Sequence, residues 1–267
     1  MSTLLSVIIP ARNEKYLQQT IDDILHNSEG EIEVIAVLDG YWPSPSIKDD
    51  PRVRLIHHGT AKGMRPSINA AVSIAKGEYL LKCDAHCSFE KGFDVILTND
   101  IEDNWIVVPR RYRLDVERWD IIEDGRPPID YMYLSPDLHG KQWSRPDLAD
   151  RKIDDLMSSQ GSCWVMKKDY FHELELLDAE AYGSFFNEFQ EIGLKCWLSG
   201  GFVKINKKTW YAHWHKSEGR GYSMGKSLKA QGEAGVKKWI EGDGWHKQIY
   251  PLSWLVDKFG PVPGWDE

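Results

Sequence analysis

The sequence predicts an α/β protein with a mainly parallel central sheet flanked by helices, and three observations carry this prediction. Strand-like segments alternate with segments of helical periodicity over residues 1–100, which is the arrangement of βαβ units. The strand-like segments are continuous apolar runs, as expected of strands that helices cover on both faces. Polar residues follow several of these runs directly, at the strand ends where ligands of such sheets bind.

The N-terminal elements follow each other at short intervals. Apolar and β-branched residues fill each strand-like run, and Pro10 marks the end of the first. Leu17, Ile21 and Ile24 recur at helical spacing, and Pro66 suits the first turn of a second helix. We therefore expect strands at residues 4–10, 31–38, 53–56 and 78–83, and helices at residues 16–25 and 66–75.

The rest of the chain is less regular. Residues 110–150 are rich in proline and aromatic residues, which predicts a long ordered excursion rather than a helix–strand repeat. Such aromatic side chains either pack an insertion or present flat faces to a ligand, and the sequence leaves both uses open. Residues 224–240 have helical character, and we expect the tail, residues 245–267, to pack back onto the same single domain.

The composition is that of a globular protein. Of the 267 residues, 42% are hydrophobic and 12% are aromatic, which is enough for a large core. No apolar run reaches the roughly 20 residues that a membrane span needs, and residues 1–10 lack a secretory signal, so we expect a cytoplasmic protein. The four scattered cysteines are predicted to be reduced thiols.

The charge distribution argues against one class of function. A net charge of −8 does not suit a protein that wraps duplex nucleic acid through bulk electrostatics. Residues 204–238 nevertheless collect lysines among aromatic residues. This stretch is either the solvated face of a helix or a patch for a phosphate-bearing ligand or an anionic acceptor.

The segment Asp84-Ala85-His86 follows the fourth expected strand. In an extended chain residues i and i+2 point the same way, so a carboxylate and an imidazole converge as ligands of a divalent cation do. The pair alone is weak, because polar residues are ordinary where a strand meets solvent. Asn13, Glu14 and Asp39 also follow expected strands, which places all these side chains in one cleft at the carboxyl edge of the sheet.

Several motifs resemble those of a known family. The stretch Ser6–Glu14, the turn Val37–Gly40 and the later Asp-x-His are similar to motifs of family 2-type glycosyltransferases, which have the Rossmann-like GT-A fold. The resemblance covers the chain up to about residue 215 and keeps the order of the motifs. It implies one catalytic domain over residues 1–267, divided into a nucleotide-binding half (1–100), an acceptor-side half (101–215) and a C-terminal loop and helical extension (216–267).

Within this group the chain is most similar to polypeptide N-acetylgalactosaminyltransferases, whose metal motif is Asp-x-His where most relatives carry Asp-x-Asp. Gly63–Ser67 resembles the stretch ahead of that motif, Gln160–Phe171 the acceptor-side strand and helix start, and Glu188–Gly201 a later conserved segment. His213 matches the third metal ligand. Those enzymes normally carry a membrane anchor and a lectin domain; neither is expected here, which favours a cytoplasmic enzyme of bacterial or viral origin.

The resemblance implies a hexosyltransferase that moves a sugar from a nucleotide diphosphate donor, with UDP preferred, to an acceptor hydroxyl. A cation bridging the two phosphates would neutralise the charge that develops as the glycosidic bond breaks. Mn²⁺ is expected ahead of Mg²⁺, because imidazole ligands favour it. The implied metal ligands are Asp84, His86 and His213, with His215 as the rival for the third position. The implied nucleotide-binding residues are Pro10, Arg12, Glu14, Asp39, Arg65, Asp84 and Trp164.

Some of these residues have ordinary alternatives. Asp39 suits a bond to the nucleoside, but an aspartate before Gly40 also stabilises a turn. Arg12 and Arg65 suit a diphosphate, although arginine is equally at home on a solvated surface. Residues 217–222 have the composition of a mobile loop that closes over the donor and excludes water.

The stereochemical outcome is predicted from a single position. Inverting relatives place an aspartate base directly after the glutamate of their Glu-Asp motif, whereas this chain has Phe189. Either Glu188 or Glu191 replaces that base, or, as in the resembling retaining family, the leaving phosphate accepts the proton. We therefore expect retention, with Glu188, Glu191 and Asp84 as candidate catalytic residues. The two glutamates also lie i,i+3 on an expected helix, which they would merely cap or solvate.

The acceptor and the reaction class keep alternatives. A glycan or lipid-linked sugar is the default acceptor, followed by a protein side chain and by a hydroxylated DNA base. A non-catalytic sugar-nucleotide binder or a pyrophosphorylase-like nucleotidyltransferase would share the fold. Pyrophosphorylases carry a glycine-rich phosphate loop after the first strand, where this chain has Ala11–Glu14.

Overall fold

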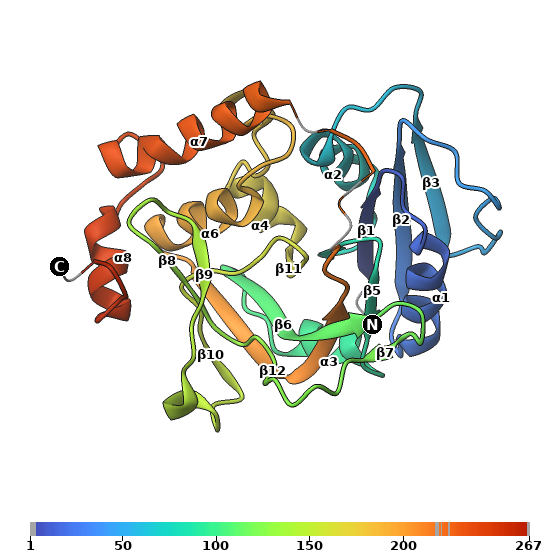
Figure 1. The fold of residues 1–267 in the computed structure, drawn as a ribbon, viewed down its shortest axis with the longest axis horizontal. Coiled ribbons are helices and arrows are strands. Elements are labelled where there is room, and N and C mark those ends of the chain that lie inside the picture. Colours follow the sequence, from blue (N-terminus) through green and yellow to red (C-terminus); the bar gives the residue numbers. More distant parts are fainter. Residues whose placement is uncertain (1–3, 217–218, 220, 224, 266–267) are drawn as a thin grey trace.

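The computed structural model describes residues 4–216, 219, 221–223 and 225–265, and a mixed sheet runs through them (Figure 1). The strands of this sheet are β1 (Leu5–Ala11), β2 (Ile32–Asp39), β3 (Val53–His58), β4 (Tyr79–Cys83), β5 (Cys87–Phe89), β6 (Trp105–Asp115), β7 (Asp120–Ile121), β10 (Ile153–Asp155), β11 (Cys163–Lys167) and β12 (Phe202–His213). Their spatial order is β10-β12-β6-β11-β4-β1-β2-β3, while β5 pairs with β12 and β7 with β6.

Most long strands of the sheet run in the same direction. β1 pairs in parallel with β2 and β4, β2 with β3, and β6 with β12. β11 is antiparallel to both of its neighbours, β4 and β6, so its amino end lies beside the carboxyl end of β4. The predicted α/β fold with a mainly parallel sheet is therefore confirmed, and one reversed strand joins its two halves.

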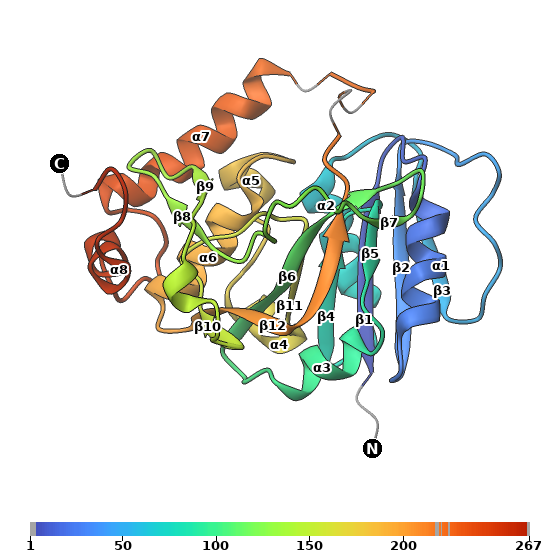
Figure 2. The same cartoon turned by 60° about the horizontal axis from the view of Figure 1, so that its bottom comes forward.

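Helices cover both faces of the sheet (Figure 2). They are α1 (Leu17–Asn27), α2 (Met64–Ile74), α3 (Phe93–Asn99), α4 (Lys168–Glu173), α5 (Ala179–Tyr182), α6 (Glu188–Leu198), α7 (Lys226–Glu241) and α8 (Leu252–Phe259). Val7 and Ile9 of β1 point into the core that α1 and α3 cover, whereas Ile8 points into the core shared with α2, α4 and α6. This alternation is the period-two pattern of a strand buried on both faces.

The elements expected before the Asp-x-His segment are all present. Helix α2 begins at Met64, which puts Pro66 in its first turn as predicted, because the missing N–H of proline is tolerated there. The sequence analysis named no elements between β4 and residue 110, where the structure has β5, α3 and the first part of β6. The boundaries of the expected strands and helices differ from the observed ones by a few residues.

The excursion over residues 110–150 is ordered, as predicted. It contains the end of β6, the strand β7 and a hairpin of β8 (Met132–Leu134) and β9 (Gly140–Gln142), followed by a short 3₁₀ turn, Pro146–Leu148. The salt bridge between Arg110 and Asp130, at 2.7 Å, ties the excursion back to β6. This region therefore forms a wall beside the sheet rather than another helix–strand repeat.

The C-terminal segment packs onto the sheet domain, as expected. The rings of Trp254 and Phe259 lie against Trp197 of α6, with centroids 6.4 and 5.4 Å away, and Trp265 donates a hydrogen bond to the carbonyl of Leu134. All four cysteines are buried free thiols, as predicted. Among the described residues, no helix combines the length and apolar character needed to cross a bilayer.

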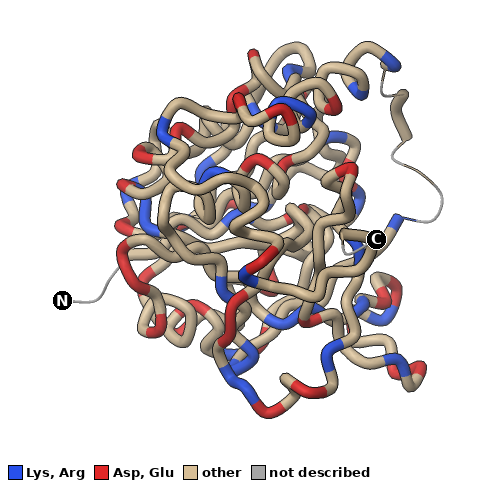
Figure 3. The backbone as a smooth tube through the Cα atoms, turned by 90° about the vertical axis from the view of Figure 1, so that its left-hand side faces the viewer, with Lys and Arg blue, Asp and Glu red and all other residues tan. Residues whose placement is uncertain are grey.

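The basic stretch at residues 204–238 is divided between β12 and α7, and acidic residues accompany it. Lys204 pairs with Asp155 at 2.6 Å, and Lys208 with Asp100 at 3.0 Å. Two exposed lysines of α7 form i,i+4 pairs, Lys229 with Glu233 and Lys237 with Glu241. Acidic and basic residues are interspersed along the described part of the chain (Figure 3). The helical part of this stretch is thus an ordinary solvated face.

Candidate functional site

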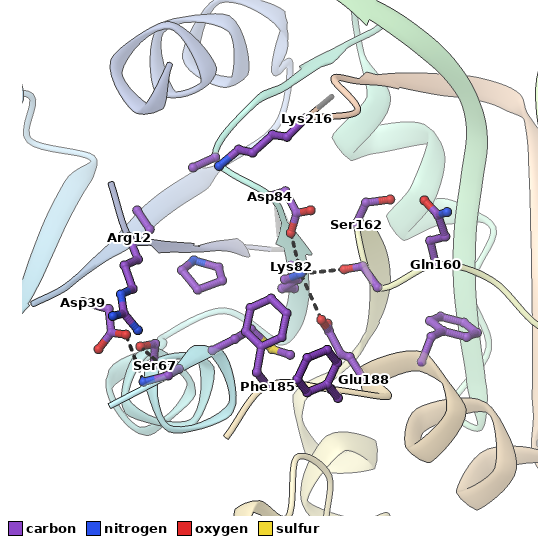
Figure 4. A pocket seen from close by; sticks show the side chains of 18 of the residues that line it. Arg12, Asp39, Ser67, Lys82, Asp84, Gln160, Ser162, Phe185, Glu188 and Lys216 are labelled. Atoms are coloured by element: carbon purple, nitrogen blue, oxygen red, sulfur yellow. Dashed lines mark hydrogen bonds and ion pairs between the residues drawn. The ribbon is translucent and has the colours of Figure 1, made fainter. Parts of the chain in front are cut away.

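A cavity of about 870 Å³ opens at the carboxyl edge of the sheet. The ends of β1, β2 and β4 and the start of α6 line it, together with the segment just before β11 (Figure 4). This is the place that the polar strand ends predicted, because the carboxyl ends of parallel strands share one edge. The cavity also receives Lys216, Gly219, Tyr222 and Leu228 from the C-terminal part of the chain.

Asp84, His86 and His213 form the cluster at the centre of this cavity. One potential ligand atom from each lies within 4.8 Å of the others. The Nε2 atom of His213 is 3.1 Å from Oδ2 of Asp84, and Nε2 of His86 is 3.9 Å from the same oxygen. The pairing of β12 with β5 sets His213 opposite Cys87 and so brings it to the turn that carries the other two side chains. His215 lines the cavity but is not part of this cluster.

The donor set of the cluster fits a divalent transition metal. It offers one hard carboxylate oxygen and two imidazole nitrogens, a combination that Mn²⁺ accepts. Burial lowers the pKa of His213 to about 4, so its imidazole is neutral at pH 7, as a metal ligand must be. Burial alone would raise the pKa of Asp84, but the charge of Lys82 and the bond to His213 hold it well below its usual range.

Glu14 contacts the cluster through His86. Its Oε2 atom lies 3.1 Å from Nδ1 of His86, and its Oε1 accepts a 2.6 Å bond from Lys216. With Nδ1 engaged, the Nε2 atom of His86 is the one that faces Asp84. A carboxylate that fixes the ring of a ligating histidine is a common outer partner in metal sites. Glu14 thus lies on the side of the cavity that carries Asp84, His86 and His213.

Lys82 and Glu188 form a second polar group in the same cavity. Lys82 donates to Oδ1 of Asp84 at 2.8 Å, to the carbonyl of Gly161 at 2.5 Å and to Oε2 of Glu188 at 3.2 Å. Trp164 donates to Oε1 of Glu188 at 2.8 Å. Burial raises the pKa of Glu188, although the nearby Lys82 partly opposes this. Lys82 was not among the predicted site residues; its only signal is a lysine inside the apolar run Tyr79–Cys83.

Comparison with known proteins places the chain in a family. The model of the family described as "Glycosyl transferase family 2" matches residues 6–175, which is more than half of the chain. The chain belongs to glycosyl transferase family 2. The resemblance inferred from the motifs is therefore confirmed, and with it the expected fold.

Two bacterial relatives of this family 2 chain share part of its sequence. Glycosyltransferase GlyG of Streptococcus pneumoniae serotype 4 (strain ATCC BAA-334 / TIGR4) is 26% identical over 204 residues, which cover 68% of this chain and 62% of GlyG. The uncharacterized glycosyltransferase EpsJ of Bacillus subtilis (strain 168) is 30% identical over 112 residues, which cover 39% of this chain and 32% of EpsJ. The matches thus span less than two thirds of either relative.

Two solved structures share the fold of this family 2 chain. GalNAc-T7, crystallised with UDP, GalNAc and Mn²⁺, superimposes with a TM-score of 0.75 and 18% identity over 91% of this chain and 50% of that one. Residues 1–349 of Staphylococcus aureus TarS, in complex with UDP-GlcNAc, give a TM-score of 0.54 and 15% identity over 85% of this chain and 64% of that one. At these identities the likeness shows the fold alone.

Three residues predicted to bind the nucleotide have side chains that bond to other residues of the family 2 domain. Arg65 is fully buried, where its guanidinium pairs with Glu191 and donates to the carbonyl of Phe186. Trp164 is also fully buried and reaches the cavity only through its bond to Glu188. Asp39 lines the cavity, but its carboxylate accepts bonds from the backbone N–H groups of residues 62 and 63. The geometry corrects the expected placement of Arg65 and Trp164, because neither lines the cavity.

Glu191 is likewise displaced from the site that the sequence predicted for it. Its Oε1 atom accepts bonds from Lys195 at 2.9 Å and from the N–H of Asp178 at 3.0 Å, while Oε2 pairs with Arg65. It is 0% exposed and does not line the cavity. This burial removes Glu191 from the candidate acids and bases and makes it part of the domain's interior.

The remaining lining residues of the cavity include Arg12 on the β1 side and several aromatic and amide side chains elsewhere. Pro10 and Arg12 lie on the β1 side, and the guanidinium of Arg12 stacks over the ring of Tyr222 at 4.1 Å. Residues 217, 218 and 220 of the predicted closing loop lie outside the described part of the chain. Another wall carries aromatic and amide side chains, namely Gln160, Phe185, Phe186, Asn187 and Gln190. Of these, Phe185, Phe186 and Asn187 lie outside every segment that the sequence analysis named.

Proposed function

We propose that this chain is a metal-dependent glycosyltransferase that transfers a sugar from a nucleoside diphosphate donor, a UDP-sugar, to an acceptor hydroxyl. The observation that carries the proposal is the convergence of Asp84, His86 and His213 in a cavity at the carboxyl edge of the sheet. The solved neighbours, which hold UDP with Mn²⁺ or UDP-GlcNAc, support this choice of donor. Membership of glycosyl transferase family 2 supports the reaction class.

Asp84, His86 and His213 are the residues that would hold the metal, with Glu14 fixing the ring of His86. The proposed ion is Mn²⁺, with Mg²⁺ as the alternative, because imidazole nitrogen suits the former better. When bound, such an ion neutralises the charge that develops on the diphosphate as the glycosidic bond breaks. Arg12 and Lys216 add positive charge to the same side of the cavity, where the diphosphate would lie.

The nucleoside would lie along the ends of β1 and β2. Pro10 and Asp39 line this part of the cavity, and Asp39 already holds the backbone of residues 62 and 63 against the end of β2. We therefore propose that Asp39 shapes the nucleoside subsite through this turn. Met64 and Ser67, from the first turn of α2, complete the wall.

Glu188 is the carboxylate proposed to face the reacting sugar. In a reaction with retention, the bond from the anomeric carbon to the diphosphate breaks, and the acceptor oxygen forms its new bond on the same face. The acceptor proton passes to the leaving diphosphate oxygen. Phe189, beside Glu188 in the sequence, cannot act as a base, which fits retention. The negative charge of Glu188 would instead stabilise the positive charge that develops on the sugar ring. An NMR assignment of the product anomer tests this step, and an inverted product would contradict it.

The acceptor is proposed to be a glycan, since one wall of the cavity carries aromatic and amide side chains. Phe185 and Phe186 offer flat apolar faces, and the amides of Gln160 and Asn187 offer hydrogen bonds that suit sugar hydroxyls. A protein side chain or a hydroxylated DNA base is the alternative acceptor. Transfer assays with mono- and oligosaccharides, a hydroxyl-bearing peptide and hydroxymethylated DNA separate these classes.

The decisive experiment combines donor and metal. The wild-type protein is incubated with a panel of UDP-, GDP- and dTDP-sugars, with Mn²⁺, with Mg²⁺ or with EDTA, and sugar release and thermal shift are measured. Turnover of a UDP-sugar that requires the metal, and a loss of at least about 10³-fold in Asp84→Ala, are expected because one of three ligands is removed. If Asp84→Ala binds Mn²⁺ and donor as the wild type does, the proposed site is wrong. Metal and donor binding without turnover would identify a non-catalytic binder.

A further inference from the structure

Lys82 is a buried cation placed between two carboxylates of the proposed site (Figure 4). Its side chain projects from β4, and its amine reaches Asp84, Glu188 and the carbonyl of Gly161. An ammonium group has three N–H donors, and these three acceptors satisfy all of them. The geometry is therefore that of a charged lysine with no donor left for a ligand.

The two carboxylate oxygens of Asp84 have different partners, because Lys82 bonds to only one of them. Oδ1 accepts from Lys82 at 2.8 Å, while Oδ2 lies 3.1 Å from Nε2 of His213 and 3.9 Å from Nε2 of His86. Only Oδ2 thus faces the two imidazoles. A cation held by this cluster would take one oxygen from Asp84.

The same ammonium fixes Glu188. Its Oε2 accepts from Lys82, and its Oε1 accepts from the indole N–H of Trp164. Gly161 closes the remaining side, since a Cβ at that position would lie 2.5 Å from Oε2. The carboxylate of Glu188 therefore has one position, and Lys82 sets its distance from the metal cluster.

We propose that Lys82 is a positioning residue that couples the metal cluster to Glu188 and balances the charge of the two carboxylates. The inference rests on the proposed function. Without Lys82, Asp84 and Glu188 would face the cation as two uncompensated negative charges. The cation would bind more tightly, and Glu188 would lose the bond that holds it in place. Lys82 therefore weakens metal binding while it supports turnover.

The test is a Mn²⁺ titration of Lys82→Met, monitored by calorimetry and by the electron paramagnetic resonance signal of free Mn²⁺. Methionine replaces the side chain as far as the Cε position and removes the ammonium group with its charge. We expect Mn²⁺ to bind at least about tenfold more tightly, because a unit of like charge is removed from its surroundings, while donor turnover falls. A purely structural lysine would give the opposite result for the metal, since a disordered cluster binds Mn²⁺ more weakly.

A second variant, Glu188→Gln, should change the Mn²⁺ affinity in the opposite direction. In Glu188→Gln the charge of Lys82 acts on Asp84 alone, so Mn²⁺ is expected to bind at least about threefold more weakly. The double variant Lys82→Met/Glu188→Gln should bind Mn²⁺ with nearly wild-type affinity, because both charges are removed together. Glu188→Gln keeps the inference testable even if Lys82→Met does not fold.

Lys207→Met is the matched control. Lys207 is also buried and bonds to Tyr131 and to the carbonyls of Leu148 and Ala149, away from the metal cluster. Its removal should leave Mn²⁺ affinity unchanged. Unchanged or weaker Mn²⁺ binding in folded Lys82→Met, or unchanged binding in Glu188→Gln, would overturn the role of Lys82 and leave the proposed transferase standing. Absence of turnover in a wild type that binds Mn²⁺ would overturn the transferase, while the titrations would still decide the role of Lys82.

Discussion

Two glutamates on the first turn of α6 show how one helix serves two regions of the molecule. Glu188 lies at the cavity and is 9% exposed, whereas Glu191, three residues later, is 0% exposed in the interior. Each takes a cation from the N-terminal half of the chain, Lys82 for Glu188 and Arg65 for Glu191. The two ion pairs look alike in chemistry. They differ in what surrounds them, because Glu188 borders the cavity whereas Glu191 is enclosed in the interior of the protein.

The sealed pair should be the more important for stability. Glu191→Ala leaves the fully buried guanidinium of Arg65 without its carboxylate, and breaking a buried pair in this way costs about 3–5 kcal/mol of unfolding free energy. Urea denaturation measures this loss, provided that the unfolding free energies of variant and wild type depend equally on urea concentration. Glu233→Ala, which removes a partner of the exposed Lys229, is the control and should change stability by less than about 0.5 kcal/mol. An equal effect in both variants would erase the contrast between buried and exposed pairs.

The cavity pair should be the more important for turnover. Glu188→Gln keeps the shape of the side chain and removes the charge proposed to face the sugar, so we expect turnover to fall by about 10²-fold. Glu191→Gln, its neighbour on the same helix, is the matched control and should retain turnover per folded molecule. Steady-state rates at saturating donor, corrected for the folded fraction, compare the two. Similar losses in both variants would show that the cavity does not distinguish them.

Gly161 gives a finer test of the same pair. A Cβ built at this position would lie 2.5 Å from Oε2 of Glu188, so Gly161→Ala should displace the carboxylate and lower turnover by about tenfold. Gly59→Ala is the control, because a Cβ there meets nothing within 4 Å. The unfolding free energy should change little in Gly59→Ala and should fall in Gly161→Ala, because the bonds of Glu188 to Lys82 and Trp164 are disturbed, so turnover is compared per folded molecule. Wild-type turnover in Gly161→Ala would mean that the position of Glu188 is not critical.

A third ion pair, of Glu33 with Arg54, should give the smallest effect. Burial would raise the pKa of Glu33, but bonds from the N–H of Lys76, from Ser6 and from Arg54 lower it below 4.5. A carboxyl group whose pKa is lower in the folded state adds stability above its unfolded pKa and loses it as the pH falls through the folded value. We expect less than about 1 kcal/mol, because Arg54 is partly exposed.

Denaturation of wild type and Glu33→Gln from pH 7 to pH 3 measures this contribution. The stability difference between them should be constant near neutral pH and should shrink as the pH falls below about 4.5. A difference that grows on acidification would mean that the folded pKa of Glu33 is raised.

The sequence predicted the sheet and the meeting of Asp39 with the Asp-x-His segment because both follow from short-range rules. Continuous apolar runs identify buried strands, and parallel strands end at one edge, so Asp39 and the Asp-x-His segment had to lie near each other. His213 was added by its resemblance to a motif rather than by such a rule. The structure shows why it fits: β12 ends beside β5, next to His86.

The roles of Glu188, Glu191 and Arg65 were not predictable in this way. Residues three apart on a helix differ by about 60° in direction, and the sequence does not say which of the two faces a cavity. Arg65 and Glu191 are 126 positions apart, and Lys82 and Glu188 are 106 apart. Only the completed fold brings these partners together.

The reversed strand β11 has a consequence for the order in which the chain folds. It fills the gap between β4 and β6, and until residues 163–167 have left the ribosome both strands carry unpaired edges. Exposed edges of this kind promote association between nascent chains. The carbonyl of Ser162 also receives the N–H of Asp84, and the carbonyl of Gly161 receives Lys82. His213 comes from β12, which follows β11 in the chain, so the cluster of Asp84, His86 and His213 can form only after both strands have joined the sheet.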